Sequence, residues 1–188
     1  PNTEYISSAA EIIIKNMTKG KIIILRSTSY PGTTEEIIGE ILNKAGYKID
    51  SDYYLAFSPE RIDPGNVKWT SDNTPIVLGG VTKKSGEFAE LVLKSAIQNV
   101  HRVSSAKVAE MEKLLENIFR SVNIALMNEL AQMCDRMGDI NIWEVIESAS
   151  TKPFGFMPFT PGPGIGGHCI LVDPYYLAYR AKGFDFHS

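Results

Sequence analysis

The chain has 188 residues, 44% of them hydrophobic, and a formal net charge of −3. This length suffices for one or two modest domains with real cores. The absence of a basic cluster argues against nucleic acid as a partner, and no apolar stretch approaches the length of a membrane span. The two cysteines lie in very different settings. They indicate no disulfide framework, so a reduced, cytoplasmic location fits best.

Strands and helices alternate over residues 1–104. Helices are predicted where apolar residues recur at helical spacing, over Thr3–Met17, Glu35–Ala45 and Lys83–Ser95. Strands are predicted at short apolar runs, at Lys21–Leu25, Tyr53–Phe57, Ile76–Gly80 and, as an edge strand, Val100–Val103. This alternation predicts a parallel α/β layer. No Gly-x-Gly-x-x-Gly follows a first strand, so the layer lacks a dinucleotide fingerprint.

The remainder, from residue 105, is predicted to be helical. Lys107–Met137 contains no proline or glycine and carries an apolar stripe, which predicts a helix on the order of 45 Å long. A helix of that length could carry a subunit interface. Further helices are predicted over Ile142–Ala149, with Trp143 and Ile146 inward, and over Asp173–Lys182. Cys134 falls within the helical apolar pattern and is predicted to be core.

The most informative run is Pro161-Gly162-Pro163-Gly164-Ile165-Gly166-Gly167-His168-Cys169. Glycine lets a ligand approach the main chain closely, and proline stiffens the backbone, so the run predicts a shaped loop. Asp173 follows four residues after Cys169, and the two share a face if a helix starts here. Helix-start N–H groups would favour a thiolate at Cys169. The simpler interpretation of a lone cysteine is a small buried side chain.

Three other polar groups come at places where open α/β sheets or long helices hold ligands. Ser27 and Thr28 follow the first strand, where they are predicted to face a ligand. Thr33 or Thr34, with Glu36, is expected to cap the next helix.

The loop that begins Ser58-Pro59-Glu60-Arg61 follows the second strand, and a salt-bridged surface loop is its simpler interpretation. Lys113 and Asn117 lie four apart beside the apolar stripe, where solvated side chains would be unremarkable.

Taken together, these runs resemble the UDP-glucose/GDP-mannose dehydrogenase family. The matching segments are Arg26-Ser27-Thr28-Ser29-Tyr30-Pro31-Gly32-Thr33-Thr34-Glu35, Ser58-Pro59-Glu60-Arg61, Ala109–Asn117 and Gly164–Cys169. They occur in the family order over nearly the whole chain. Asp63-Pro64-Gly65-Asn66 and Lys152–Pro158 look most like the branch that oxidises UDP-N-acetylglucosamine.

The resemblance implies an α/β fold with two parts. Residues 1–104 would be the C-terminal part of a Rossmann-like NAD-binding domain with a parallel sheet. Residues 105–188 would be an all-α central dimerisation domain with the cysteine loop. We therefore expect a piece of a longer protein, inactive by itself, that forms a homodimer through the 107–137 helix. The implied cofactor is NAD and the implied partner is a UDP-sugar, in cytoplasmic polysaccharide biosynthesis.

The resemblance also implies a four-electron oxidation of the sugar C6 alcohol to a carboxylate. Cys169 resembles the nucleophile that captures the aldehyde as a thiohemiacetal and later holds a thioester. Lys113 resembles the cation that stabilises the oxyanion, and Asn117 would hydrogen-bond the same oxygen. Asp173, with Thr28, would order or activate a water. Glu60 is the family's candidate base for thioester hydrolysis.

Binding residues follow from the same resemblance. The nicotinamide end of NAD would contact Ser27, Thr28 and Ser29. Substrate contacts are expected from Glu60, Arg61, Lys113, Asn117, Thr160, Gly162, Gly164 and Gly166. Three positions depart from the family: Arg26 stands where many relatives have Glu, Leu171 where a Pro is usual, and Pro64 where relatives that act on UDP-glucose often have a second Glu. The chemistry requires the Cys169 thiol, the Lys113 ammonium and the Glu60 carboxylate to converge on one pocket.

Other readings remain open. The substrate could instead be UDP-glucose, UDP-N-acetylmannosamine or GDP-mannose. The chain could serve only as a binding and dimerisation module, because it lacks the NAD loop. A thiol hydrolase using Cys169 with His168 is disfavoured, since adjacent residues point apart. A zinc site from His168, Cys169 and Asp173 is not expected, because the usual four-ligand spacing is absent.

Overall fold

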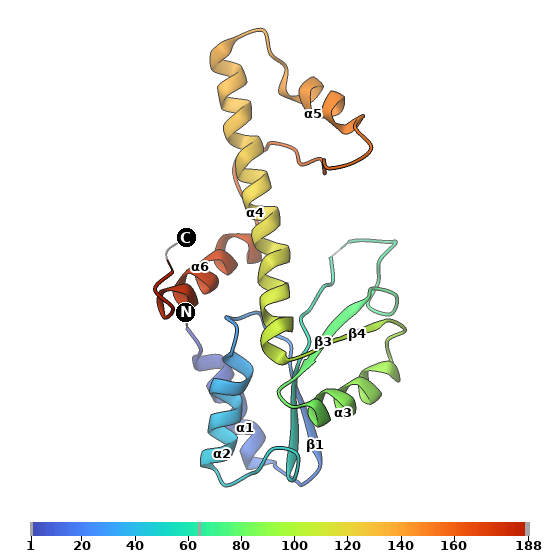
Figure 1. The fold of residues 1–188 in the computed structure, drawn as a ribbon, viewed down its shortest axis with the longest axis vertical. Helices are drawn as coiled ribbons and strands as arrows, with labels where there is room; N and C mark the ends of the chain where they lie inside the picture. Colours follow the sequence, from blue (N-terminus) through green and yellow to red (C-terminus); the bar gives the residue numbers. More distant parts are fainter. Residues whose placement is uncertain (1, 64, 187–188) are drawn as a thin grey trace. The chain divides into compact units, whose positions relative to one another are not determined.

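The computed structural model describes residues 2–63 and 65–186 (Figure 1). Pro64, in one of the runs quoted above, therefore lies outside the described residues. By packing, the chain forms two compact units. We call Pro1–Leu114 with Tyr175–Ser188 the sheet unit, and Leu115–Pro174 the helical unit. The domain boundary expected at residue 104 concerns the whole protein and stays a prediction.

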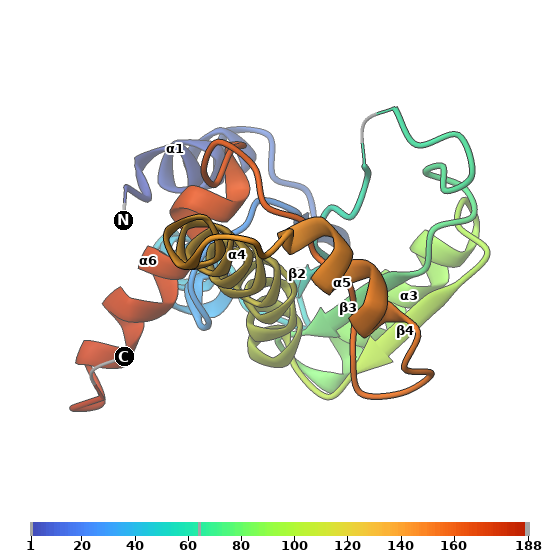
Figure 2. The same ribbon diagram turned by 90° about the horizontal axis from the view of Figure 1, so that it is seen from above.

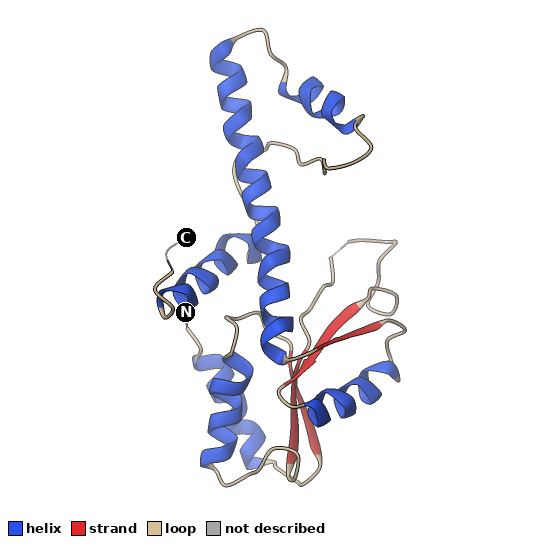
Figure 3. Ribbon diagram, viewed as in Figure 1, coloured by secondary structure: helices blue, strands red, loops and turns tan. Residues whose placement is uncertain are grey.

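The sheet unit is built on four strands, drawn red in Figure 3. They are β1 (Lys21–Leu25), β2 (Tyr53–Phe57), β3 (Ile76–Gly80) and β4 (Val100–Val103), in the spatial order β1-β2-β3-β4. The four apolar runs predicted as strands are thus confirmed, and β4 lies at an edge as predicted. β1 and β2 are parallel, with Leu25 opposite Phe57, so both strands end at the same edge of the sheet.

The sheet is mostly parallel, with one exception. β3 pairs with β4 in parallel, but β2 pairs with β3 antiparallel, with Phe57 opposite Gly79. A parallel return needs a crossover, usually a helix. The described part of the segment between β2 and β3 contains no helix. The chain therefore turns back instead of crossing over, and this segment stays at the sheet edge where β2 ends.

Helices cover both faces of the sheet (Figures 1 and 2). On one face lie α1 (Glu4–Lys15), a π-helical stretch η1 (Thr34–Gly39) and its continuation α2 (Glu40–Lys44). Their core includes Ile23 of β1 and Leu55 of β2. On the other face lies α3 (Lys83–Lys94). Its Ala89 forms a core cluster with Ala56 of β2, and Ile22 and Ile24 of β1 pack against this cluster. Alternate residues of β1 and β2 thus face opposite layers, as the apolar runs require.

Three helices complete the chain: α4 (Ala106–Met137), α5 (Ile142–Ser150) and α6 (Cys169–Lys182). Two expectations need correction. Ile142 and Ile146 face the core of the helical unit, whereas Trp143 is 56% exposed and does not point inward. In addition, α6 begins at Cys169 rather than at Asp173. Cys134 is buried in the core of the helical unit, as predicted. No helix among residues 2–63 and 65–186 is long and apolar enough to cross a membrane.

A buried carboxylate joins α4 to the turn after β1. Glu110 is 1% exposed and accepts the Gly32 N–H at 2.6 Å, the Thr34 N–H at 2.8 Å and the Thr34 hydroxyl at 2.6 Å. These N–H groups belong to the start of η1, which has no intrahelical partner for them. The cap expected from Thr33 or Thr34 is therefore wrong. The Thr33 hydroxyl donates to the Tyr30 carbonyl, and Glu110 caps the helix from a distant part of the chain.

Burial raises the pKa of the Glu110 carboxyl, and its three donors lower it without overcoming that effect. We predict that Glu110→Gln destabilises the chain by about 1–3 kcal/mol, because one oxygen becomes an NH₂ group that faces buried donors. Urea unfolding followed by circular dichroism measures the loss. The control is Glu129→Gln, an exposed residue of the same helix, which should change stability by less than about 0.5 kcal/mol. Equal stability of the two variants would contradict a stabilising role for the hydrogen bonds of Glu110.

Candidate active site

Two polar turns meet at the sheet edge where β1 and β2 end. The Ser58 N–H donates to the Leu25 carbonyl at 3.0 Å, which ties the two turns together. Of the serines and threonine predicted to contact the cofactor, Ser27 is exposed, Thr28 is half-buried and Ser29 is buried. The Ser29 hydroxyl has no hydrogen-bond partner within the described residues. The carboxyl end of adjacent parallel strands is where open α/β sheets bind ligands.

Glu60 accepts several hydrogen bonds at this edge. One carboxylate oxygen, Oε2, accepts from the Arg26 guanidinium at 2.8 Å. The other, Oε1, accepts the N–H of Arg61 at 2.9 Å and of Ile62 at 3.0 Å. The backbone carbonyl of Glu60 accepts the Lys113 ammonium at 2.7 Å. The sheet unit thus brings Glu60 together with Lys113, two of the residues predicted to act in catalysis.

These bonds control the charge of Glu60. Burial raises the pKa of its carboxyl, but the Ile62 N–H, the Arg26 guanidinium and the Arg61 N–H together outweigh that effect. The pKa of Glu60 therefore lies below its usual range. The side chain is an ionised acceptor at neutral pH, which a base must be before it can take a proton.

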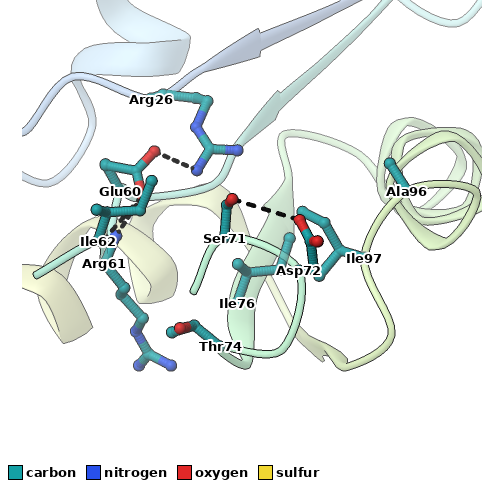
Figure 4. Close-up of a pocket in the computed structure, with 10 residues that line it drawn as sticks. All are labelled: Arg26, Glu60, Arg61, Ile62, Ser71, Asp72, Thr74, Ile76, Ala96 and Ile97. Atoms are coloured by element: carbon teal, nitrogen blue, oxygen red, sulfur yellow. Dashed lines mark hydrogen bonds and ion pairs between the residues drawn. The ribbon is translucent and has the colours of Figure 1, made fainter. Parts of the chain in front are cut away.

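Arg61, expected to contact the substrate, is held by the chain itself. Its guanidinium donates to Glu112 and, at 3.0 Å, to the Pro75 carbonyl. Beside it lies a cavity of about 250 Å³ (Figure 4). Its lining residues come from both turns, the β2–β3 segment, the start of β3 and the segment that follows α3: Arg26, Glu60, Arg61, Ile62, Ser71, Asp72, Thr74, Ile76, Ala96 and Ile97. Glu60 thus borders a small cavity whose lining includes both positively and negatively charged side chains.

The helical unit holds the cysteine. Cys169 is exposed and is the first residue of α6. Asp173, one turn later, is 3% exposed and accepts the Asn117 amide at 2.5 Å. Asn117 itself is only 5% exposed and comes from α4. This bond fixes the first turn of α6, and with it Cys169, against α4. Asn117 lies one helical turn after Lys113 on α4, so their side chains project from the same face.

The glycine run before Cys169 is pinned at one point. The Gly162 N–H donates to the Asn128 side chain at 2.8 Å. Gly167 has a φ of 93°, which favours glycine. Added Cβ atoms at Gly162 and Gly166 would meet no described atom within 4 Å, so the chain's own packing does not require these two glycines, whereas Gly164 has a φ of 150°. A cavity of about 440 Å³ borders the run, lined by Arg120, Ile124, Pro158, Phe159, Thr160, Pro161, Gly162 and Gly164.

The expected residues thus form two groups. Glu60, Arg61 and Lys113 lie in the sheet unit with Ser27, Thr28 and Ser29. Asn117, Cys169 and Asp173 lie in the helical unit with Thr160, Gly162, Gly164 and Gly166. Convergence of Cys169 with Lys113 and Glu60 stays a prediction. Within the part of the chain that is described, no cluster of three or more His, Cys, Asp or Glu could hold a metal ion.

Sequence reasoning missed several residues of these sites. Glu110, which fixes the start of α4, lies on the same buried face as Ala106 and Ala109, and a carboxylate among small buried residues was the available signal. Asn128 carries an amide within the apolar stripe of α4. Arg120 comes seven residues after Lys113, on the same side of the helix. The pairing of Arg26 with Glu60 had no signal, because it joins turns from different strands.

Two family models match the sequence. Residues 1–97 match the NAD binding domain of the UDP-glucose/GDP-mannose dehydrogenase family, and residues 107–188 match its central domain. A Rossmann-type NAD-binding sheet followed by a helical central domain is the architecture predicted, and NAD is the cofactor predicted. The chain belongs to the UDP-glucose/GDP-mannose dehydrogenase family.

Individual members of the family are similar to this chain over nearly its whole length. A UDP-N-acetyl-D-glucosamine 6-dehydrogenase from Pseudomonas aeruginosa is 42% identical over 100% of this chain and 44% of its own length. A UDP-N-acetyl-D-mannosamine dehydrogenase from Campylobacter jejuni is 40% identical over 96% of this chain and 46% of its own. The structure of a UDP-D-ManNAc dehydrogenase from Pyrococcus horikoshii aligns with a TM-score of 0.89 and 38% identity, over 97% of this chain and 43% of that one. The chain thus spans less than half the length of these relatives.

We predict that Asn117→Ala loosens the first turn of α6, because the buried Asp173 carboxylate loses its amide donor. A hydrogen bond to a charged group contributes about 1.5–3 kcal/mol, so amide hydrogen exchange in this turn should accelerate by more than tenfold. The control is Asn123→Ala, on the same helix, whose amide donates only to the Phe119 carbonyl. If both variants leave exchange at residues 170–173 unchanged, the bond does not hold the cysteine turn.

Proposed function

We propose that this chain forms part of an NAD-dependent nucleotide-sugar 6-dehydrogenase. The reaction oxidises the C6 alcohol of a UDP-sugar to a carboxylate. One observation carries the proposal: an exposed cysteine begins α6, and the aspartate one turn later is buried and bonded to Asn117 of α4. This is a thiol on a rigid support, next to the glycine run whose backbone is open to a ligand.

Covalent capture explains why the site needs a thiol. The Cys169 sulfur adds to the C6 aldehyde and forms a thiohemiacetal, and removal of a hydride from that carbon leaves a thioester. Water then attacks the thioester, which releases the carboxylate product and returns the proton to the thiol. The covalent bond keeps the aldehyde in place between the two oxidations.

The other side chains supply charge and hydrogen bonds. The Lys113 ammonium would stabilise the negative oxygen that develops at C6, an effect on the order of 3 kcal/mol for one preorganised donor, and Asn117 would add a second donor. Glu60, ionised at neutral pH, would accept the proton of the attacking water. Asp173, with Thr28, would orient that water. The proposal requires these groups to face a single substrate.

NAD fits the sheet unit. The exposed Ser27, the half-buried Thr28 and the buried Ser29 hydroxyl, which has no partner among described residues, stand where parallel strands end. These residues would hold the nicotinamide end of the cofactor, which accepts the hydrides. The remaining contacts of NAD would come from outside this chain, which lacks a Gly-rich dinucleotide loop.

The substrate would lie along the glycine run. The cavity of about 440 Å³ beside Thr160, Gly162 and Gly164 has the size of small-molecule sites. Backbone N–H groups of Gly164–Gly166 would follow the sugar and the diphosphate, since the Gly162 N–H is already bonded to Asn128. UDP-N-acetylglucosamine is our first candidate, supported by the Pseudomonas relative and by the Lys152–Pro158 run. The Campylobacter and Pyrococcus relatives make UDP-N-acetylmannosamine the main competitor.

We predict that the full-length protein containing these residues forms NADH from UDP-N-acetylglucosamine, two per sugar oxidised, whereas the 188-residue chain alone forms none. Cys169→Ser should lower NADH formation by a factor on the order of 10³ or more, because the nucleophile is lost. Cys134→Ala, in the helical core, is the matched control and should retain activity. An assay at 340 nm across UDP- and GDP-sugars measures both. A full-length protein inactive on all of them would refute the proposal.

A second role is supported by the surface of α4. Large apolar side chains remain exposed along it: Val108, Met111, Leu115, Phe119, Val122, Leu126, Met133 and Met137. Exposed apolar patches of this kind mark interaction sites. We propose that α4 pairs with the same helix of a second copy in a two-fold homodimer, so that this chain also acts as a dimerisation module.

We predict a dimer in sedimentation velocity at micromolar concentration. The double variant Leu115→Asp/Val122→Asp places two charges on the exposed stripe, two helical turns apart, where Leu115 is 62% and Val122 is 60% exposed. It should sediment as a monomer, because burial of unpaired charges opposes association. Leu91→Asp, an exposed apolar position on α3, is the control and should remain dimeric. A monomeric unaltered chain would exclude the dimer.

A further inference from the structure

We propose that Arg26 is a positioning residue for Glu60: its guanidinium takes one of the two acceptor positions of Oε2, which leaves a single position of that oxygen to work as the base, and keeps the carboxylate ionised. The inference rests on the proposed function, which gives Glu60 the role of base. It adds a role for the residue at which the sequence departs from many members of the family.

The bonds around Glu60 leave a defined acceptor position. An ionised carboxylate offers about four lone-pair positions, two on each oxygen. The N–H groups of Arg61 and Ile62 occupy both positions of Oε1, at 2.9 and 3.0 Å. Arg26 occupies one position of Oε2, at 2.8 Å. The position that remains is on Oε2, beside the cavity of about 250 Å³ (Figure 4).

The neighbouring charges single out Arg26. Lys113, from α4, contacts the backbone carbonyl of Glu60 at 2.7 Å rather than its carboxylate. The Arg61 guanidinium is engaged by Glu112 and the Pro75 carbonyl. Asp72, across the cavity, accepts from the Ser71 hydroxyl at 3.3 Å. Among the described residues, Arg26 is therefore the cation whose side chain bonds the Glu60 carboxylate.

The same pair has a consequence for proton transfer. The Arg26 side chain is 38% exposed and that of Glu60 is 48% exposed, so water and salt screen the attraction in part. With Arg26 present, the Glu60 carboxylate stays ionised to lower pH. Without it, two of the effects that lower the pKa of Glu60 are lost, and the carboxylate takes up a proton at higher pH.

The first test needs no enzymatic activity. The titration midpoint of Glu60 is measured in the 188-residue chain by NMR of side-chain carboxyl carbons, with Glu60→Gln to assign the resonance. We expect Arg26→Gln to move the midpoint to higher pH and Arg26→Lys to restore most of the difference. Arg102→Gln removes an equal charge from a pair with Glu87 and Glu90 and should leave the midpoint in place. A midpoint that Arg26→Gln does not change overturns the proposal.

A salt titration tests the pair without any substitution, even where Arg26→Gln does not fold. Raising ionic strength from about 0.05 M to about 1 M shortens the screening length about fourfold, so the midpoint of Glu60 in the unaltered chain should rise. A midpoint that is constant or falls with salt overturns the proposal.

The second test uses the full-length protein. In Arg26→Gln, the acid limb of the pH profile of kcat should move to higher pH, in the same direction as the midpoint, and Arg26→Lys should bring it back. A raised midpoint with an unmoved acid limb overturns the role of Arg26 in catalysis. A raised midpoint in a protein without activity on any nucleotide-sugar supports the control of Glu60 by Arg26 and overturns the proposed function instead.

Discussion

The buried carboxylate of Glu110 is the interaction on which the arrangement of the candidate site residues of the sheet unit depends. It reaches from the first turns of α4 to the helix start that follows the turn with Ser27, Thr28 and Ser29. Lys113 lies one turn further along the same helix. The position of its ammonium relative to the strand ends is therefore set by an acceptor that is 1% exposed. Burial of a carboxylate costs free energy unless the group is hydrogen-bonded. The three donors offset this cost because the geometry places them within hydrogen-bond distance of Glu110.

Each of the two groups of site residues is held by a hydrogen bond from a side chain of α4. In the sheet unit, Lys113 of α4 binds the backbone of Glu60. In the helical unit, Asn117 of the same helix binds Asp173 and so fixes the turn that begins with Cys169. Long polar side chains lose much conformational entropy when they are ordered. Here that loss is met before any substrate arrives, because each group already has a fixed partner.

Much of this architecture was predictable, and the failures have common causes. Strand runs such as Lys21–Leu25 were recognisable because two-sided burial requires continuous apolar sequence. Cys169 was recognisable because four glycines surround it.

The pairings of Arg26 with Glu60 and of Glu110 with Thr34 were not predictable, since a charge in a turn or helix looks the same with any partner. The antiparallel β2–β3 return was missed because alternation suggested a crossover that the segment has no helix to make. Trp143 was misplaced since helical spacing alone does not decide between adjacent faces.

The antiparallel return of β2 to β3 has an evolutionary consequence. It leaves the segment after Glu60 as an irregular wall at the rim of the sheet where β2 ends, with Ser71, Asp72 and Thr74 beside the cavity. Doubling the length of such a connection costs only about 0.6 kcal/mol in closure entropy. Insertions and deletions could therefore reshape this wall between orthologues while the strand register behind it stays constant. The rim offers a route for selectivity to diverge without any change in the scaffold that carries the chemistry.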